Sequence, residues 1–304
     1  MRPGWKRALH VRPAAPPVPR PFFLAQPRLR RASPVSQYAV AAALEALGDA
    51  APLYKKGGLR LGLIVCAMCG CVNYSRRFLD ETLKDPAVAS PLLFPETVLN
   101  APASHLAAFL HTSTPYYSLV GDPSVFLQGL AMAADWLLDG QADGCLVIGT
   151  EEMDWLAASA AWLFDRNIIL SEGAGALYLR LAAPQDHGVF LHAVTDAHLF
   201  TQRQSRARAA QLARADLAPA QPDELLCDGL QGARRTDLDE ASAWNEWTGP
   251  RLSVKRILGE GLAAAAAWQC VAAVDSLAAN RFPAATVSVV GCNQQAIAAQ
   301  FQRR

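Results

Sequence analysis

A short turn at residues 121–124 carries side chains that could take part in acyl transfer. Its sequence, Gly-Asp-Pro-Ser, follows a segment of strand character, Tyr116–Val120, and precedes an apolar helix expected over about Ser124–Leu138. Many acyl-transfer enzymes place a nucleophilic cysteine on such a turn, because the N-terminus of the next helix favours its ionised form. This turn has no cysteine. Asp122 suits an N-cap and Pro123 the first helical position, so a structural role is also consistent with the pattern.

A stand-alone acyltransferase or thioester hydrolase would need another nucleophile, and the sequence offers Ser124 or Cys227. The segment around Ser124 does not match the Gly-x-Ser-x-Gly pattern of a nucleophile elbow, and the proline before it stiffens the turn. We keep this interpretation as the alternative.

The seven cysteines do not form a disulfide pattern, because their number is odd and they are scattered, at positions 66, 69, 71, 145, 227, 270 and 292. This usage favours a reducing compartment. Cys66, Cys69 and Cys71 are close together, but no second Cys/His pair follows at zinc-finger spacing. Small buried residues at the end of a strand account for them better, and we predict neither a metal site nor a cofactor.

Charged side chains also cluster at a few places. Glu151, Glu152 and Asp154 follow a strand, and without a matching acid pattern they are expected to form a solvated or capping face. A basic helix is expected at 201–215. Its arginines form either a solvated face or a docking patch for an acidic partner. They are Arg203, Arg206, Arg208 and Arg214.

Strand and helix patterns alternate along the chain and predict a layered α/β protein. The expected strands are 59–65, 116–120, 144–149, 168–180, 189–194 and 285–290. The expected helices are 36–47, 75–84, 100–111, 124–138, 201–215, 239–247 and 260–278. We divide the chain into an arm, 1–34, and two halves of similar pattern, 35–183 and 184–304.

Composition narrows the class of protein. The 304 residues are 52% hydrophobic, enough for a large core, and the formal net charge of +1 argues against nucleic-acid binding. Residues 1–34 hold eight Lys/Arg, no acid and many prolines, which predicts an extended or mobile arm. The longest apolar helix, near 261–274, is too short to cross a bilayer. We therefore expect a cytoplasmic protein that does not bind membranes.

Several motifs in a fixed order resemble the β-ketoacyl-ACP synthases, the condensing enzymes of the thiolase fold. In the first half they are Asn100-Ala-Pro-Ala-Ser-His, the strand and helix at 116–138, Ala142–Glu151 and Ser171–Leu177. In the second half, Lys255 to Glu260 is similar to the family's Lys-x-x-x-Gly-His stretch, and Val290–Asn293 to a shortened closing loop. The resemblance implies a layered α-β-α-β-α fold of two related halves, with the C-terminal half abridged.

Members of this family use a cysteine for the acyl chain, two histidines, a lysine and backbone N–H groups that bind an oxyanion. By this resemblance the cysteine position falls at Pro123, and Glu260 replaces one histidine while Lys255 is kept. Asp228 lies nearest the place of the other histidine, and Asn293 lies in the closing loop. No histidine follows His198, so the region that should supply both has none. We expect Lys255 to form a structural salt bridge with Glu260 or Asp228.

The resemblance therefore predicts a non-catalytic subunit, a chain length factor, in fatty-acid, polyketide or aryl polyene biosynthesis. Its implied partners are an active ketosynthase, in a heterodimer, and an acyl carrier protein. Tyr116, Tyr117 and Leu119 would lie at the dimer interface. Phe109 and Leu110 would lie beside the acyl-chain pocket, although core packing explains them equally well.

Overall fold

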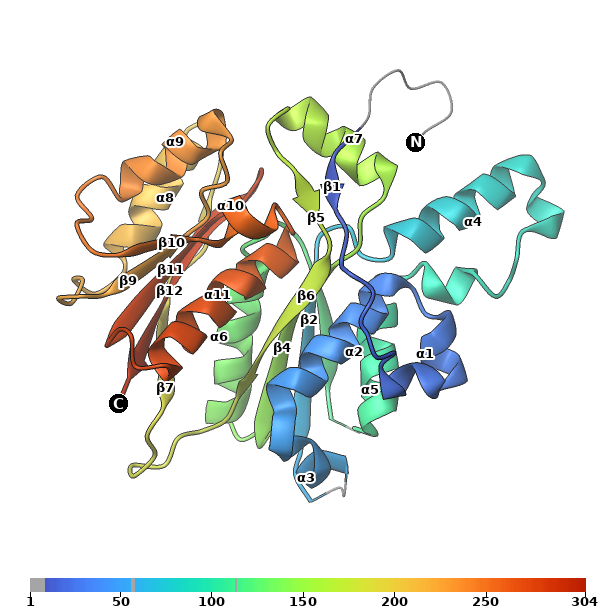
Figure 1. Cartoon of the computed structure of the whole chain (residues 1–304), viewed down its shortest axis with the longest axis horizontal. Helices are drawn as coiled ribbons and strands as arrows, with labels where there is room; N and C mark the ends of the chain where they lie inside the picture. The colour runs from blue at the N-terminus through green and yellow to red at the C-terminus, as the bar shows by residue number, and fades with distance from the viewer. Residues whose placement is uncertain (1–8, 56–57, 113) are drawn as a thin grey trace.

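The computed structural model describes residues 9–55, 58–112 and 114–304, and in it two β-sheets alternate with three layers of helices (Figure 1). The layers, from right to left in Figure 1, are α2 and α5, the first sheet, α6 and α11, the second sheet, and α8 and α9. This confirms the predicted α-β-α-β-α order. Within the described residues, no helix is long and apolar enough to span a bilayer.

The first sheet has the strand order β3-β2-β4-β6. Its strands are β2 (Leu61–Ala67), β3 (Tyr116–Val120), β4 (Gly144–Glu151) and β6 (Gly173–Leu179). β2 is parallel to β3 and β4, and β6 is antiparallel to β4. Every residue of β2 and β4 is buried, because helices cover both faces of these central strands.

The second sheet repeats this pairing, in the order β10-β9-β11-β12-β7. Its strands are β7 (Val189–Val194), β8 (His198–Leu199, beside β12), β9 (Leu225–Asp228), β10 (Arg251–Ser253), β11 (Ala284–Val290) and β12 (Gln295–Arg303). β9 is parallel to β10 and β11, and β12 is antiparallel to β11. The two halves are thus built on one plan. The connection between β9 and β10 is residues 229–250, shorter than the corresponding 68–115 of the first half.

The six layer helices are α2 (Pro34–Leu47), α5 (Ala101–Leu110), α6 (Val125–Leu138), α8 (Arg206–Ala215), α9 (Arg234–Ala243) and α11 (Ala263–Ala278). α6 and α11 lie between the sheets and contribute to the largest hydrophobic core. Alanines let α11 approach the first sheet closely. A Cβ on Gly149 of β4 would lie 2.2 Å from the Ala263 carbonyl oxygen, so only glycine fits there.

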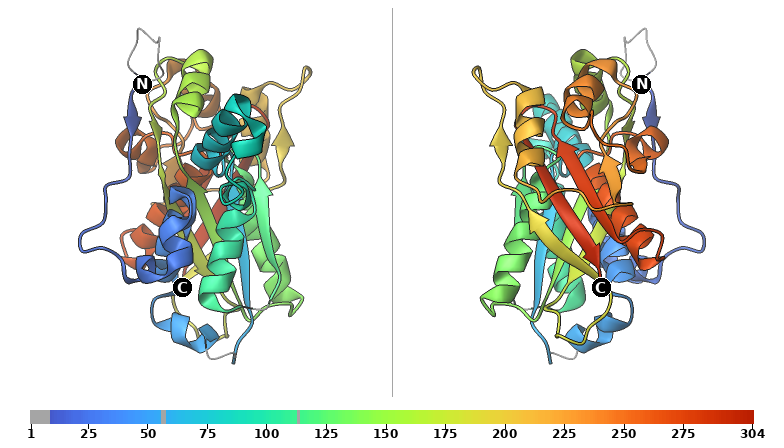
Figure 2. Two further views of the ribbon diagram at one scale, coloured as in Figure 1. Left: turned by 90° about the vertical axis from the view of Figure 1, so that its right-hand side faces the viewer. Right: turned by 90° about the vertical axis from the view of Figure 1, so that its left-hand side faces the viewer.

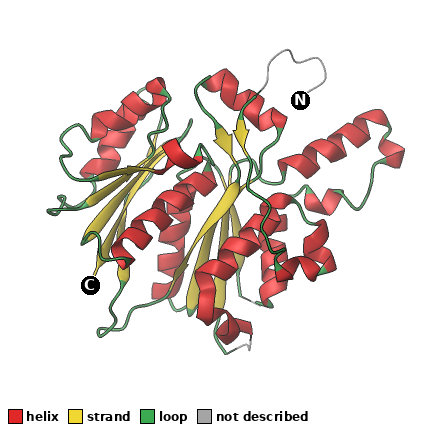
Figure 3. Cartoon of the chain, in the orientation of Figure 1, coloured by secondary structure: helices red, strands yellow, loops and turns green. Residues whose placement is uncertain are grey.

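Shorter elements surround the layers (Figure 3). They are β1 (Val11–Arg12), paired with β5 (Leu170–Ser171), α1 (Pro27–Arg31), α3 (Ala51–Lys55), α4 (Val72–Lys84), α7 (Trp155–Phe164), α10 (Val254–Leu258) and four 3₁₀ turns, Phe22–Ala25, Gly48–Ala50, Pro86–Val88 and Phe94–Glu96. Residues 1–8 of the predicted arm lie outside the described residues. Farther along the arm, Phe23 and Leu29 are buried in the core that α2 and α5 share with the first sheet. The boundaries near residues 34 and 183 stay predictions.

The turn after β3 differs from the predicted cap. α6 begins at Val125, and Ser124 is its N-cap residue without a side-chain hydrogen bond. Pro123 therefore precedes the helix, and the Asp122 side chain points elsewhere. Sequence patterns also gave no strand at 295–303, no strand at 225–228 and no helix at 155–164, where β12, β9 and α7 lie.

Candidate functional site

The candidate site lies where the turn after β3 meets the loop between β11 and β12. The Asp122 carboxylate, only 1% exposed, accepts four backbone hydrogen bonds from this loop. The donors are the N–H groups of Cys292 (2.8 Å), Asn293 (3.2 Å), Gln294 (3.3 Å) and Gln295 (3.2 Å). Successive N–H groups that converge in this way form an anion-binding concavity. Here the protein's own carboxylate fills it.

Gly291 makes this arrangement possible. A Cβ at Gly291 would lie 1.4 Å from Asp122 Oδ2, so the carboxylate occupies the space of a side chain. Burial raises the pKa of Asp122, and the four N–H groups oppose that rise. The opposite side of the loop is held by Arg206, whose guanidinium donates to the carbonyl oxygens of Val290 and Gly291 at 2.9 Å each.

Lys255 and Glu260 form a buried ion pair behind this loop. Lys255 Nζ lies 2.8 Å from Glu260 Oε2, and each side chain is 3% exposed. Burial alone would lower the pKa of Lys255, but the Glu260 carboxylate outweighs it and the pKa is raised. Glu260 also accepts a hydrogen bond from the N–H of Leu262, the residue before α11, at 2.8 Å. The predicted pair is confirmed, with Glu260 and not Asp228 as the partner of Lys255.

Asp228 and Glu240 are two further buried acids near the pair. Asp228, at the end of β9, accepts a hydrogen bond from Ser253 Oγ at 2.6 Å, and burial raises its pKa. Glu240 of α9 accepts from the N–H of Gly229 and from Ser288 Oγ, both at 2.8 Å. Burial raises the Glu240 pKa to about 6. Nothing in the sequence pattern pointed to Glu240, because a single acid on a short polar helix gives no sign of burial.

The space left between these groups is very small. A cavity of about 10 Å³ is lined by side chains and backbone that include Phe164, Lys255, Glu260 and Cys292. Such a volume holds about one water molecule. It cannot accept an acyl chain, and the nearby acids Glu240 and Glu260 would repel a developing oxyanion or enolate.

The two alternative nucleophiles are both enclosed. Ser124 is fully buried, and its hydroxyl has no hydrogen-bond partner among the described residues, hence no base to activate it. Cys227 is fully buried in β9, and burial raises its pKa to about 12, which disfavours the thiolate. Cys292 is closer to the site, but burial raises its pKa as well. The geometry thus gives no support to acyl transfer through Ser124 or Cys227.

The other predicted clusters are mostly structural. Glu151 and Glu152 are fully buried, so the expectation of a solvated face is wrong for them. The capping alternative is confirmed, since Asp154 is the N-cap of α7 and accepts the N–H of Leu156 at 2.6 Å. Glu152 accepts from Ser33 Oγ and from the N–H groups of Val35 and Asn73, which ties α2 and α4 to the end of β4. Among the described residues, no three His, Cys, Asp or Glu side chains are placed to hold a metal ion.

The basic helix α8 directs two of its arginines inward, against the idea of a uniform docking patch. Arg206 holds the loop at 290–291, as described above. Arg214 lies over the Trp244 ring, with its guanidinium carbon 5.4 Å from the ring centroid.

The predicted pocket and interface residues fall into two groups. Phe109 and Leu110 are 4% and 1% exposed and pack into the core on the outer side of the first sheet. Core packing accounts for both. Tyr116 and Tyr117 are 39% and 51% exposed on β3, an edge strand, and Leu119 is half-buried. Asn293 contributes its backbone N–H to Asp122, whereas its side chain is exposed.

Two sheets built on one plan, a turn-to-helix junction and a closing loop of N–H groups are features expected from the resemblance to the condensing enzymes. A family model, Beta-ketoacyl synthase, N-terminal domain, matches residues 13–182, more than half of the chain. This chain belongs to the β-ketoacyl synthase family. No curated protein shows a significant match to its sequence.

Solved structures share the fold, which is that of thiolase-like ketosynthases. The ishigamide ketosynthase/chain length factor has a TM-score of 0.74 at 19% identity, with 92% of this chain and 83% of that chain covered. A type II polyketide synthase acyl-carrier protein in complex with its ketosynthase has a TM-score of 0.77 at 13% identity, with 99% and 91% covered. A β-ketoacyl synthase from Burkholderia phymatum STM815 has a TM-score of 0.75 at 16% identity, with 98% and 90% covered.

Proposed function

We propose that this chain is a non-catalytic subunit of the chain-length-factor type, which pairs with an active β-ketoacyl synthase. The observation that carries the proposal is the occupied site. By the family resemblance Pro123 stands at the position of the nucleophile, and the Asp122 carboxylate binds backbone N–H groups of the closing loop that would otherwise be free to bind another anion. The remaining cavity of about 10 Å³ leaves no room for an acyl group.

The surface around β3 supports a role in pairing. β3 is an edge strand whose residues Tyr116, Tyr117 and Val120 are each between 39% and 51% exposed. Ser118 Oγ donates to Asn100 Oδ1 at 2.9 Å and so connects β3 to the segment before α5. Exposed apolar side chains continue through α4 and that segment; they are Leu79, Leu83, Val88, Leu92, Phe94, Val98 and Leu99. An open strand edge beside such a surface is typical of a protein–protein interface.

In this role the chain shapes the acyl-chain pocket across the interface, and an acyl carrier protein delivers the chain to the catalytic partner. Fatty-acid, polyketide and aryl polyene biosynthesis are the pathways that use such a pair. The structural similarity to a ketosynthase/chain length factor and to a carrier-protein complex supports the proposal at the level of the fold.

Co-purification with a ketosynthase encoded beside this chain tests the pairing. We expect a 1:1 heterodimer in size-exclusion chromatography with light scattering. Tyr117→Asp together with Val120→Asp should abolish it, because two carboxylates would be buried at the interface. Leu238→Asp, at an exposed position of α9, is the matched control and should leave the complex intact.

Mass spectrometry after incubation with acyl carrier protein loaded with an acyl chain tests the absence of catalysis. The chain alone should gain no acyl adduct, whereas the partner's cysteine should be acylated. An acyl adduct on this chain at any residue, or condensation by the chain without a partner, would overturn the proposal.

A further inference from the structure

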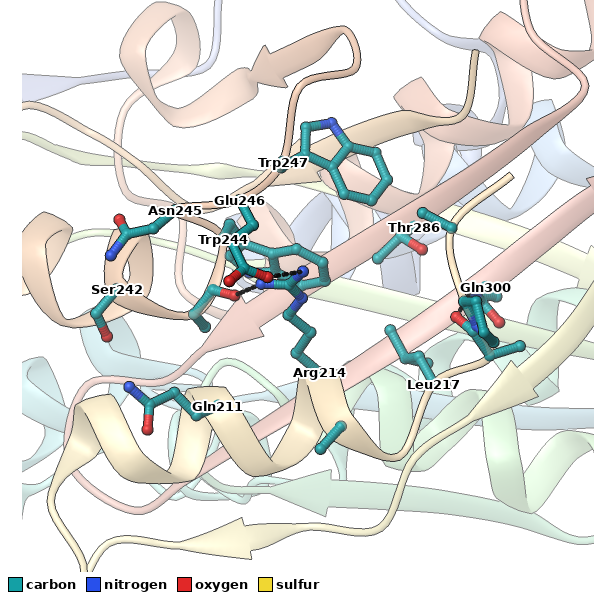
Figure 4. Close-up of a pocket in the computed structure, with 15 residues that line it drawn as sticks. Gln211, Arg214, Leu217, Ser242, Trp244, Asn245, Glu246, Trp247, Thr286 and Gln300 are labelled. Carbon is teal, nitrogen blue, oxygen red and sulfur yellow. Dashed lines mark hydrogen bonds and ion pairs between the residues drawn. The ribbon is translucent and has the colours of Figure 1, made fainter. Parts of the chain in front are cut away.

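The outer face of the second sheet holds a cavity that the proposed function does not use. The right-hand view of Figure 2 faces α8 and α9, which cover only part of β11 and β12. Between α8, residues 217–220 and the end of α9 lies a cavity of about 500 Å³ (Figure 4). It shares no lining residue with the small cavity near Asp122. Its size is within the range of small-molecule sites.

The floor of this cavity contains an unsatisfied acceptor. Gln300 of β12 is 5% exposed, and its Nε2 donates to the carbonyl oxygen of Ala218 at 3.3 Å. That bond fixes the orientation of the amide. Gln300 Oε1 has no hydrogen-bond partner among the described residues. Since buried acceptors are almost always paired, an N–H or O–H donor from a ligand that displaces the atoms now covering this oxygen would complete it.

The walls offer rigid aromatic surfaces. Trp244 and Trp247 pack edge to face, with ring centroids 5.6 Å apart and an interplanar angle of 82°. Their indole N–H groups already donate to Ser288 Oγ at 3.1 Å and to the Pro250 carbonyl oxygen at 3.2 Å. The rings are therefore held in place. Trp247 is partly exposed and presents carbon surface to the cavity, whereas Trp244 is 3% exposed and supports Trp247 and Arg214 from below. Leu217 adds a further apolar side chain, so the walls suit a flat apolar body.

A cation lies at the rim. Arg214 of α8 reaches over Trp244, and its Nη2 lies 3.7 Å from Glu246 Oε2. The Glu246 side chain is 88% exposed, so this ion pair is weak and readily exchanged. Figure 4 shows Arg214 and Glu246 on one side of the cavity and Gln300 on the other. A carboxylate on a ligand would pair with Arg214 more closely than Glu246 does.

We propose that this cavity binds a small aromatic carboxylic acid that carries a hydroxyl group. The aromatic ring packs against Trp247 and Leu217, the hydroxyl donates to Gln300 Oε1, and the carboxylate pairs with Arg214. Binding at this site is independent of the pairing with a ketosynthase.

Isothermal titration of the full chain tests the site with two probes, 4-hydroxybenzoate and the longer 3-(4-hydroxyphenyl)propanoate. At least one should bind about fivefold more tightly than its analogue with a methyl group in place of the hydroxyl, because only the hydroxyl satisfies Gln300. Gln300→Leu should abolish this preference. The variant should bind the methyl analogue at least as tightly as the unchanged protein does. Gln302→Leu, two residues along β12 and outside the cavity, is the matched control and should keep the preference.

Arg214→Gln tests the cation. It should lower the affinity of the chain for both acids and leave the affinity for p-cresol, which lacks a carboxylate, unchanged. Thermal unfolding of each variant checks that it is folded. The proposal is overturned if neither probe binds the folded chain at about 10 mM. It is also overturned if the hydroxyl preference is the same in Gln300→Leu as in the unchanged protein.

Discussion

At the scale of single residues, the Asp122 carboxylate occupies a position that backbone N–H groups make suitable for an anion. A carboxylate that accepts four such bonds offsets much of its own desolvation. It also joins the first half of the chain to the last loop, across more than 160 residues of sequence. The same contact therefore closes the site and connects the two halves.

Replacement of Asp122 by Asn should lower the free energy of unfolding by about 2–4 kcal/mol, although the two side chains have nearly the same size. The amide has one acceptor oxygen, and its NH₂ group would face N–H donors. Urea denaturation measures the change. Asp139→Asn, at the exposed end of α6, is the control and should change the free energy by less than about 0.5 kcal/mol. Equal effects of the two variants would contradict the role given to Asp122.

The Lys255–Glu260 pair should show strong coupling. Lys255→Met alone leaves a buried carboxylate without its counterion and should cost about 3–5 kcal/mol. Addition of Glu260→Gln removes that charge, so the double variant should be more stable than the sum of the single effects predicts, by more than about 1 kcal/mol. A double-mutant cycle in urea measures this coupling. Additive effects would mean that the two charges do not depend on each other.

At the scale of elements, close approach of α11 to β4 determines which residues the central layer tolerates. Gly149 of β4 faces the first turn of α11, where the nearest neighbour is backbone and cannot move aside like a flexible side chain. Alanines along α11 serve the same contact, since their small side chains let the helix lie close to the sheet. This contact also sets the position of Glu260, just before the helix.

Gly149→Ala should therefore destabilise the protein by about 2–3 kcal/mol through overpacking. Gly121→Ala is the matched control, because a Cβ there would meet its nearest neighbour at an ordinary 3.7 Å. Thermal unfolding of both variants provides the comparison. A Gly149→Ala protein as stable as the control would show that α11 can move away from β4 without cost.

The prediction of elements succeeded where apolar periodicity was strong and failed where it was weak. β7 and β3 were predicted with their exact ends, and β11 within one residue. β12 was missed because Gln295–Arg303 is rich in Ala and Gln, which have low strand propensity. Its pairing with both β11 and β7 makes it a strand nonetheless. Tertiary pairing outweighed local preference there.

At the scale of the whole molecule, buried acids make stability depend on pH. Burial raises the pKa of Glu151 to about 8 from an ordinary 4.5, and the carboxyl group lies where β4 ends beside α11. Between these two values the folded chain binds a proton that the unfolded chain has released. Stability therefore falls as pH rises through this interval.

We expect a decrease of about 1.4 kcal/mol per pH unit from Glu151 between pH 5 and 8. Glu151→Gln should remove this part of the dependence, since its amide does not titrate. Urea denaturation at pH 5, 6, 7 and 8 measures both slopes. Identical slopes in the two proteins would show that Glu151 stays charged when it is folded.

The family could be predicted from the sequence, because its ordered motifs can be read without coordinates, and the family model confirms it. The absence of histidine after residue 198 is also a property of the sequence, and our inference that the catalytic groups are lost starts from it. The sequence also predicted the layered order and gave Glu260 as one of two candidate partners of Lys255, with Asp228 as the other. The folded chain was needed to show that Asp122 binds the closing loop, that Glu151, Glu152 and Glu240 are buried, and that a separate cavity lies beside Gln300. These facts depend on contacts between residues far apart in the chain. Local patterns register propensity and periodicity, but they carry no information on which distant N–H group will face a carboxylate.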